Sequence, residues 1–346
     1  MAPTVLVHGL GAVGSIYAYL LQKAGCAVTV VCRSNYDAVK SNGITIDSVL
    51  YGKGIRVHPT VVRSGEEAAE HGTFDYVLVT TKVLPGMNTP AAIAPVVTAG
   101  HTCIVLAQNG IAIEDAYLEA FPKNVIISAV VYLPTTQIEP GRISMGNMEL
   151  LEVGTFPATA YNDDSMGAKQ TVDTLVALLD KGGCNVHFYP DIQQRRWNKL
   201  LINATWNPIC ALTLSRDVAF LASSPAAEHL IRGVMLEVVA IAQGLGYSSI
   251  SAEAADKQLK IATERLGGNG IEPSMLVDVL SRRRTEVEVI LGNPIKVAKR
   301  VGVVVPRMET LYALTAALDE SIAFAQPGKS LGGEETRSAR AVHGSS

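Results

Sequence analysis

The feature that most constrains the fold of this chain is a glycine motif directly after a short apolar run. Thr4-Val5-Leu6-Val7-His8 precedes Gly9-Leu10-Gly11-Ala12-Val13-Gly14, and a helical pattern and a second apolar run at 27–31 follow. Strand, G-x-G-x-x-G, helix and strand in this order are typical of a dinucleotide-binding βαβ unit. The glycines let backbone N–H groups approach a pyrophosphate closely. We therefore expect a Rossmann domain in which residues 9–14 bind the cofactor.

The residues after the second apolar run indicate which dinucleotide binds. NAD sites usually place Asp or Glu at the end of this strand, where the acid binds the ribose 2′-hydroxyl. Here the sequence is Val31-Cys32-Arg33-Ser34-Asn35, without an acid. Arg33 and the small polar residues beside it suit a 2′-phosphate, so we predict NADP(H). The alternative is a surface arginine without a ligand.

Two polar residues follow predicted core strands in the first half of the chain. Lys82 follows the apolar run 75–81, and Asn109 follows the run 102–107. Ligands of open α/β sheets bind outside the carboxyl ends of the strands, so both residues are placed to meet cofactor or substrate. The alternatives are a simple turn at Asn109-Gly110 and a solvated strand end at Lys82.

Other runs complete a predicted first domain, residues 1–190. Residues 44–62 carry turn signals and suggest a hairpin excursion before the sheet resumes. The remaining predicted elements are strands at 125–132, 148–154 and 186–189, a turn at Pro140-Gly141 and a helix at 166–179.

After Pro190-Asp191 helical patterns dominate, which predicts an all-α second domain at residues 191–326. The patterns lie at 192–207, 224–245, 251–266, 275–301 and 307–325. The apolar faces of these helices could form a homodimer interface or an internal core, and the sequence leaves both alternatives open. Residues 327–346 are rich in Gly and Ser and lack apolar periodicity, so we predict a disordered tail.

A polar stripe is predicted on the first of these helices. Lys199, Asn203 and Asn207 are spaced i, i+4, i+8, so a helix places them on one face. The residues between them are almost all apolar, which is typical of a buried helix. Burying an ammonium and two amides is costly unless they have partners. The stripe therefore predicts a binding site, and the alternative is a helix with one solvated face.

The composition argues against several classes of protein. The chain has 346 residues, a net charge of -3, 48% hydrophobic and 18% charged residues, as in ordinary globular proteins. This charge gives no general attraction to nucleic acid or anionic membranes. The five cysteines show no C-x-x-C spacing and look like core residues of a reducing compartment. We find no metal-ligand cluster, no apolar run long enough to span a membrane and no signal peptide, so we expect a cytoplasmic protein.

In combination these features resemble the ketopantoate reductase (2-dehydropantoate 2-reductase) family over about residues 4–325. The specific elements are Thr81-Lys82, Gln108-Asn109-Gly110, Trp197-x-Lys199-Leu200 with Asn203 and Asn207, and Pro273-Ser274-Met275-Leu276-x-Asp278 followed by Arg284-Thr285-Glu286. The resemblance implies a Rossmann domain and a helical C-terminal domain like that of 6-phosphogluconate dehydrogenase. It also implies an active site in the cleft between them.

The resemblance further implies a role for each site residue. Lys199 would be the general acid, and Glu286 would hold the substrate. The substrate pocket would be shaped by Asn109, Asn203, Asn207 and Ser274, and the cofactor would be bound by Arg33, Lys82 and Asn109 besides residues 9–14. The chemistry agrees, because hydride transfer to a ketone builds negative charge on the oxygen, which an ammonium can stabilise and protonate. Ser274 is also predicted to be an N-cap, a role compatible with binding a carboxylate. The alternative for Glu286 is a pair with Arg282 or another neighbour on a solvated face.

The implied reaction is the NADPH-dependent reduction of 2-dehydropantoate to (R)-pantoate on the route to pantothenate. The chain departs from the family pattern at Leu291-Gly292, where Asn-Gly is common, and at Glu288, where Asp is usual. These departures leave room for another 2-oxo acid or a carbonyl intermediate of secondary metabolism. A non-catalytic NADPH-binding regulator is a third alternative, but it would need a broken catalytic set, and Lys199, Asn203 and Glu286 are present.

Overall fold

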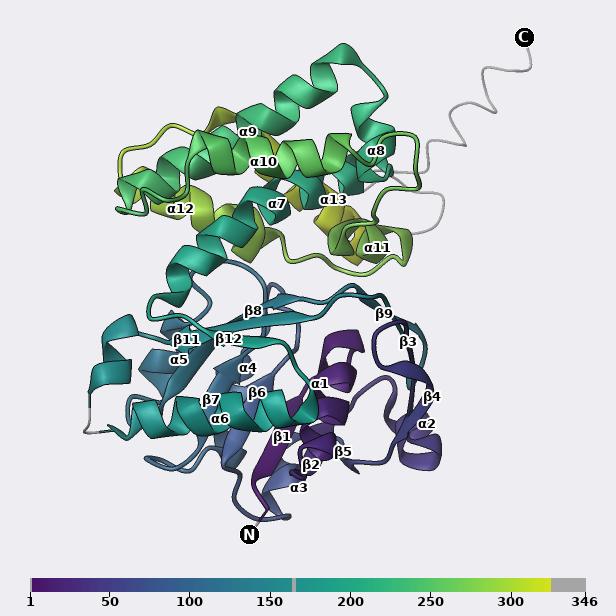
Figure 1. The fold of residues 1–346 in the computed structure, drawn as a ribbon, viewed down its shortest axis with the longest axis vertical. Helices are drawn as coiled ribbons and strands as arrows, with labels where there is room; N and C mark the ends of the chain where they lie inside the picture. The colour runs from purple at the N-terminus through teal and green to yellow at the C-terminus, as the bar shows by residue number, and fades with distance from the viewer. Residues whose placement is uncertain (1, 164–165, 325–346) are drawn as a thin grey trace. The chain divides into compact units, whose positions relative to one another are not determined.

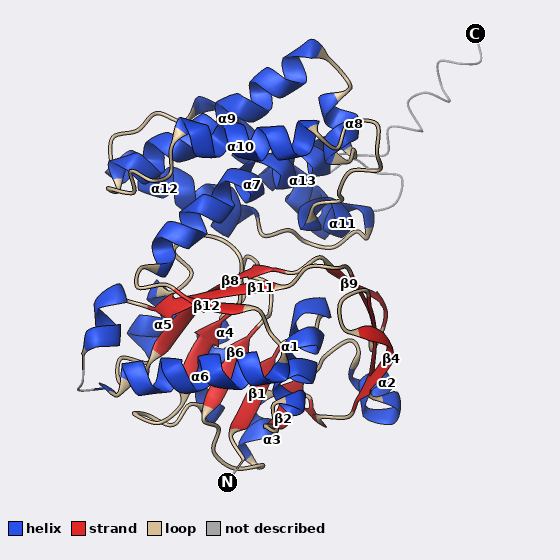
Figure 2. Cartoon of the chain, viewed as in Figure 1, coloured by secondary structure: helices blue, strands red, loops and turns tan. Residues whose placement is uncertain are grey.

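The computed structural model describes residues 2–163 and 166–324, and the chain separates into two compact units, Met1–Arg196 and Trp197–Ser346 (Figure 1). In the described residues, strands occur only in the first unit, and the second unit is helical (Figure 2). The expected combination of an α/β Rossmann domain with an all-α domain is therefore confirmed. The tail predicted at 327–346 lies outside the described residues.

A mostly parallel sheet forms the centre of the first unit. In the described part of the chain its strands lie in the order β12 (Val186–Phe188), β11 (Leu150–Thr155), β8 (Ile126–Tyr132), β7 (Cys103–Leu106), β6 (Tyr76–Val79), β1 (Thr4–His8), β2 (Ala27–Val31) and β5 (Thr60–Val62). Neighbouring strands are parallel except β11 and β8. The chain leaves β1 toward β2 on one side and returns to β6 on the other. This reversal places the topological switch point, where such sheets bind ligands, beside β1.

Helices cover both faces of this sheet (Figure 2). On one face α1 (Ala12–Lys23) packs against α6 (Ala168–Gly182), and on the other lie α3 (Gly65–Ala69), α4 (Thr89–Ile93) and α5 (Asp115–Ala120). The short segments α2 (Tyr36–Asn42), η1 (Ala94–Val96) and η2 (Ala158–Asn162) complete the unit. Because both faces are covered, the central strands are apolar along their whole length, and Val5, Leu6 and Val7 are at most 1% exposed.

A small second sheet accounts for the predicted excursion at 44–62. Its strands lie in the order β4 (Gly52–Val57), β3 (Ile44–Ser48), β10 (Arg142–Met145) and β9 (Thr135–Glu139). The hairpin β3–β4 confirms the excursion, and the chain rejoins the main sheet at β5. Pro140-Gly141 connects β9 and β10, which were not predicted, because β9 is largely exposed and lacks an apolar alternation.

The second unit is a bundle of helices. Its elements are α7 (Ile192–Thr213), which contains the boundary between the units, α8 (Asp217–Leu221), α9 (Pro225–Gly244), α10 (Ala252–Thr263), α11 (Ser274–Leu280), a π-helical segment (Glu288–Gly292), α12 (Asn293–Arg300) and α13 (Pro306–Phe324). Two sequence predictions were wrong here. Helix α7 does not end before Pro208 but continues through it to Thr213.

The other wrong prediction is a single helix over 275–301. Helix α11 ends at Leu280, and Arg282 follows in the left-handed region with φ 51°. The N–H of Thr285 then bonds to the Asp319 carboxylate instead of a helical carbonyl. Further on, Pro294 has no N–H to give to the preceding turn, and the π-helical segment lies directly before it.

Candidate functional site

The glycine motif forms the turn between β1 and α1 in the first unit. Gly9 has φ +105°, which favours glycine, and a Cβ at Gly14 would lie 2.3 Å from the Gly9 carbonyl oxygen. A Cβ at Gly11 would meet no atom within 4 Å, so this side of the turn is open. The first turn of α1 has no acidic residue and no side-chain cap, which leaves its N–H groups to a ligand. These features fit a pyrophosphate.

Asn35 supports this turn from β2's side. Its side-chain amide donates to the carbonyl of Leu10 at 2.7 Å, and Asn35 is only 6% exposed. Asn35 is therefore turned inward, and the prediction that the small polar residues beside Arg33 suit a 2′-phosphate applies only to Ser34. Arg33 and Ser34 are both exposed. No local pattern indicated the inward role of Asn35, because the contact joins residues 25 positions apart in the chain.

His8 ends β1 beneath the glycine turn and is 2% exposed. Burial, together with the nearby positive charge of Arg33, lowers the pKa of His8 to about 4. Its ring is therefore neutral near pH 7. A neutral ring adds no charge beside the predicted dinucleotide turn.

Lys82 and Asn109 stand at matching places after neighbouring parallel strands. Val79 of β6 pairs with Leu106 of β7, and Lys82 and Asn109 each follow three residues later. Both side chains are partly buried. The side chain of Gln108 links the two segments, because its amide donates at 2.7 Å to the carbonyl of Thr81, the residue before Lys82. The structure thus brings the predicted cofactor residues of the first unit to one edge of the sheet.

In the second unit, α7 carries the polar row Lys199, Asn203 and Asn207. Lys199 and Asn203 are partly buried, whereas Asn207 is 4% exposed. Asn207 Oδ1 accepts hydrogen bonds from the Met275 backbone N at 3.1 Å and from Ser274 Oγ at 3.3 Å. Asn207 therefore serves as the cap of α11. The row divides into a structural member, Asn207, and two members with partly accessible side chains.

The prediction that Ser274 is the N-cap of its helix was wrong. The N-cap position is Pro273, and the cap comes from Asn207 of another helix. Ser274 is the first helical residue, and its side chain is exposed. Because Asn207 satisfies the helix end, the Ser274 hydroxyl is not needed as a cap.

Glu286 is 6% exposed and lies in the irregular segment after α11, not on a helix as predicted. The segment is held by Asp319 of α13, which accepts from the Thr285 N at 2.6 Å and from Arg284 Nε at 3.0 Å. The alternative of a pair with Arg282 on a solvated helical face therefore does not apply. Sequence reasoning missed Asp319, since it is one acid among several in an amphipathic helix.

The two departures from the family pattern lie in the π-helical segment. Leu291 is fully buried, and Glu288 accepts a short hydrogen bond from the Tyr312 hydroxyl. The hydrogen bond to Glu288, with a further contribution from burial, raises the pKa of Tyr312 to about 12. Glu288 therefore has a partner of its own within the second unit.

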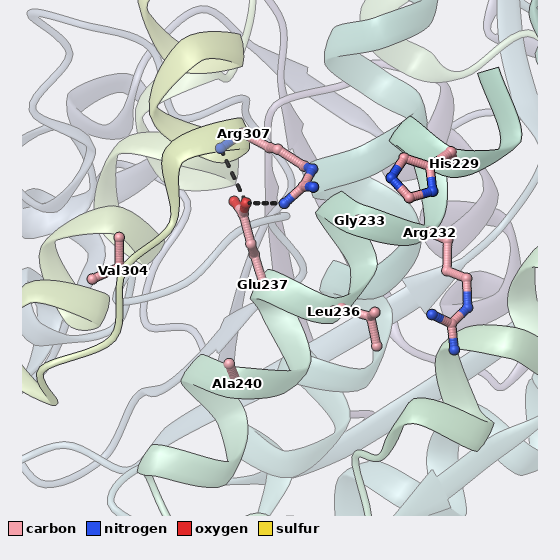
Figure 3. Close-up of a pocket in the computed structure, with 8 residues that line it drawn as sticks. All are labelled: His229, Arg232, Gly233, Leu236, Glu237, Ala240, Val304 and Arg307. Atoms are coloured by element: carbon pink, nitrogen blue, oxygen red, sulfur yellow. Dashed lines mark hydrogen bonds and ion pairs between the residues drawn. The ribbon is translucent and has the colours of Figure 1, made fainter. Parts of the chain in front are cut away.

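A hollow of about 240 Å³ on the second unit contains none of the predicted site residues (Figure 3). It is lined by His229, Arg232, Gly233, Leu236, Glu237, Ala240, Val304 and Arg307. Glu237 accepts from the Arg307 backbone N at 3.1 Å and from Arg307 Nη1 at 3.2 Å, and Arg232 pairs with Asp256. Each arginine is thus balanced by a carboxylate. This balance favours a structural role at the start of α13 over the binding of an anion.

Other features of the described residues concern metals, thiols and membranes. No group of three or more His, Cys, Asp or Glu in 2–163 and 166–324 is placed to hold a metal ion. The five cysteines are buried and free, and burial raises the pKa of Cys32 to about 12. None of the described helices combines the length and the apolar character that a membrane span requires.

Comparison with known proteins finds two family models in this chain. The model described as ketopantoate reductase PanE/ApbA matches residues 5–158, and the model of the ketopantoate reductase PanE/ApbA C terminal matches residues 191–319. An uncharacterised protein of Saccharomyces cerevisiae is 34% identical over 336 residues, which cover 90% of this chain and 92% of that protein. A 2-dehydropantoate 2-reductase of Nostoc sp. is 27% identical and covers 90% of this chain and 94% of its own.

A solved structure shows the same fold. The crystal structure of 2-dehydropantoate 2-reductase from Methylococcus capsulatus aligns with a TM-score of 0.81 and 32% sequence identity. The alignment covers 96% of this chain and 100% of that chain.

Proposed function

Because the chain belongs to the ketopantoate reductase family, we propose that it is an NADPH-dependent oxidoreductase that reduces a 2-oxo acid, with 2-dehydropantoate as the first candidate substrate and (R)-pantoate as the product. The observation that carries the proposal is the pair Lys199 and Asn203, two partly buried polar side chains one turn apart on α7 with only apolar residues between them. An ammonium in such surroundings is suited to an oxygen that gains negative charge.

The cofactor part of the proposal is supported by the first unit. The open side at Gly11 and the uncapped N-terminus of α1 suit the pyrophosphate. Arg33 is exposed after β2, where an NAD-binding site would have an acid, and its guanidinium suits the 2′-phosphate of NADPH. The bound nicotinamide would supply the hydride. Lys82 and Asn109, after β6 and β7, would contact the cofactor at the edge of the sheet where ligands of such folds bind.

The substrate part of the proposal assigns the proton to Lys199. Its Nζ would donate a hydrogen bond to the carbonyl oxygen of the substrate and would then transfer a proton to it as the alkoxide forms. Asn203, one turn later, would orient Lys199 or the oxygen through its amide. Asn207 would affect the substrate indirectly, because it caps α11 and thereby positions Ser274.

Glu286 would select the substrate. Glu286 is 6% exposed, and a buried carboxylate at a binding site favours a ligand whose hydroxyl can donate to it. We propose that Glu286 accepts a hydrogen bond from the hydroxyl of 2-dehydropantoate. The exposed Ser274 hydroxyl would donate a hydrogen bond to the carboxylate of the substrate. The expected cleft between the two domains stays a prediction.

The test is a steady-state assay that follows NADPH absorbance with 2-dehydropantoate and a panel of other 2-oxo acids. Lys199→Ala is expected to lower kcat by about 100-fold or more, as for loss of a general acid. Lys260→Ala is the matched control, since Lys260 is 74% exposed in a surface pair with Glu264. The control should keep wild-type kcat.

The outcomes separate the alternatives. Highest kcat/KM for 2-dehydropantoate supports the proposed reaction. A better 2-oxo acid in the panel would keep the reaction type and replace the substrate. Tight NADPH binding without turnover of any panel member would contradict catalysis and favour a regulator. Equal rates with NADH and NADPH would contradict the role of Arg33.

A further inference from the structure

One fully buried arginine of the first unit has no part in the proposed chemistry. The side chains of Arg196 and Glu114 are 3% and 0% exposed, and Arg196 Nε lies 2.8 Å from Glu114 Oε1. Glu114 Oε1 also accepts from Ser128 Oγ at 2.7 Å and from Gln193 Nε2 at 2.8 Å. Burying an ion pair is costly, and apolar side chains in its place are often equally stable. Stability alone is therefore a weak explanation for this pair.

The guanidinium of Arg196 also binds four backbone carbonyls. Nη1 donates to Gln108 O at 2.9 Å and to Gly110 O at 3.0 Å. Nη2 donates to Leu106 O at 3.3 Å and to Ala129 O at 3.2 Å. Nε donates to the Ser128 hydroxyl, beside Glu114. An arginine has five N–H donors, and here each of them has an acceptor.

These acceptors surround one predicted site residue. The two carbonyls bound by Nη1 belong to the residues directly before and after Asn109. The backbone on both sides of Asn109 is thus tied to a single nitrogen atom, which restricts the direction of its side chain. Burial lowers the pKa of Arg196, and the Glu114 carboxylate opposes this shift. An arginine nevertheless stays charged, because its guanidinium is not deprotonated in proteins.

The restraint extends to the neighbouring strand. The Gln108 side chain donates to Thr81 O at 2.7 Å, and its amide oxygen accepts from the Tyr117 hydroxyl at 3.2 Å. Thr81 directly precedes Lys82. The buried guanidinium of Arg196 therefore restrains the segment that carries Asn109 directly and the segment that carries Lys82 through Gln108.

We propose that Arg196 is a positioning residue for the site at the carboxyl ends of β6 and β7. It fixes the turn 108–110 and thereby sets the direction of Asn109 and, through Gln108, the backbone before Lys82. The inference rests on the proposed function, because Asn109 and Lys82 are site residues only within it. Lysine cannot replace Arg196, since an ammonium presents its three donors from a single atom and cannot reach four separated carbonyls.

The first experiment compares Arg196→Lys with Arg195→Lys in the full chain. Arg195 is a matched control, because it is the neighbouring residue of α7 and pairs with another buried carboxylate, Glu152, at 2.8 Å. Its hydrogen bonds do not include the turn 108–110. Arg196→Lys is expected to lower kcat/KM for NADPH and for the 2-oxo acid by about 10- to 100-fold, the scale of a small misplacement. Arg195→Lys should stay within about 2-fold of wild type, because its pair lies outside the site.

Hydrogen exchange of the same proteins gives a readout that needs no substrate. Arg196→Lys should speed amide exchange in peptides that cover 106–112 and leave those that cover 150–155 unchanged. Arg195→Lys should show the reverse. If Arg196→Lys fails to fold, Arg196→Met combined with Glu114→Gln removes both buried charges and leaves none unpaired, while the turn still loses its donors.

Each outcome decides between the two claims. Equal kinetic constants for both variants, with unchanged exchange at 106–112, would show that Arg196 only stabilises the fold. Faster exchange at 106–112 with wild-type kinetics would also overturn the positioning role. A wild-type chain that neither binds NADPH nor turns over a 2-oxo acid would instead overturn the proposed function, and this is seen before any variant is made.

Discussion

In each unit an ion pair holds a segment of the candidate site, but opposite members of the pair bind the backbone. In the first unit Arg196 is the anchor, because its guanidinium donates to carbonyls around Asn109. In the second unit the anchor is Asp319, which accepts from the Thr285 N–H and hydroxyl next to Glu286. Arg284, the partner of Asp319, is 28% exposed, whereas the partner of Arg196 is 0% exposed.

The difference shows how the local backbone decides which charge a fold needs. A turn after a strand presents carbonyl groups, which only a donor can bind, and arginine has the most donors of any side chain. The segment between α11 and the π-helical turn presents an N–H, which needs an acceptor. Substitution of Arg196 should therefore disturb the backbone segment of the first unit, and substitution of Asp319 should disturb that of the second.

The largest effect on stability is expected for Asp319→Ala. It leaves the Thr285 N–H and the Arg284 guanidinium without their main acceptor, and breaking a buried pair in this way costs about 3–5 kcal/mol. Urea unfolding measures the loss. Glu320→Ala is the control, because Glu320 is 53% exposed and pairs with the same arginine at 3.6 Å, so its loss should cost less than about 1 kcal/mol. Similar losses for both variants would break the comparison between the units.

Acid should affect the first unit through His8. The folded state binds a proton on His8 only near pH 4, whereas the unfolded chain binds one near pH 6.5. Between these values the unfolded state binds more protons, so stability falls as the pH falls. About 2 kcal/mol should be lost from pH 7.5 to pH 5 by this route.

The measurement is urea unfolding at both pH values for wild type and His8→Asn. The substitution should remove most of this acid-dependent loss. His71→Asn, at an exposed histidine of the same unit, should leave the loss unchanged. A loss that His8→Asn does not reduce would mean that other groups govern the acid response.

The smallest effect is expected within the polar row of α7. Asn207→Ala removes the acceptor of the Met275 N–H and should cost about 1 kcal/mol, as for loss of a helix cap. Asn203→Ala, one turn earlier and partly buried, should cost less stability but lower kcat if the proposed function holds. Thermal unfolding and the NADPH assay together would separate the two asparagines. A larger stability loss for Asn203→Ala would contradict this division of roles.

The sequence predicted most of the first unit because its signals are local. The apolar strands and the glycine turn follow from residues close in sequence. Strands β9 and β10 were missed because they are half exposed. In the second unit, the predicted helix 275–301 is interrupted at Arg282, whose backbone is in the left-handed region. No glycine or proline near Arg282 predicts that turn.

The sequence suggested candidate site residues but not the contacts that each of them makes in the structure. A spacing of four placed Asn203 and Asn207 on one face correctly. It could not show that Asn207 caps a helix 67 residues later in the chain. Likewise Arg196 and Glu114 are brought together only by the fold, so neither stands out in the sequence. Contacts between residues far apart in the chain could not be predicted from the sequence pattern.

The carbonyl-binding arginine also has an evolutionary consequence. Loss of either Arg196 or Glu114 alone would leave a charge buried without its partner, so single changes should be rare among functional relatives. We expect the two positions to change together, from an arginine–acid pair to two uncharged residues. Homologues that keep neither charge would need another way to order the turn 108–110, such as a shorter loop or a proline.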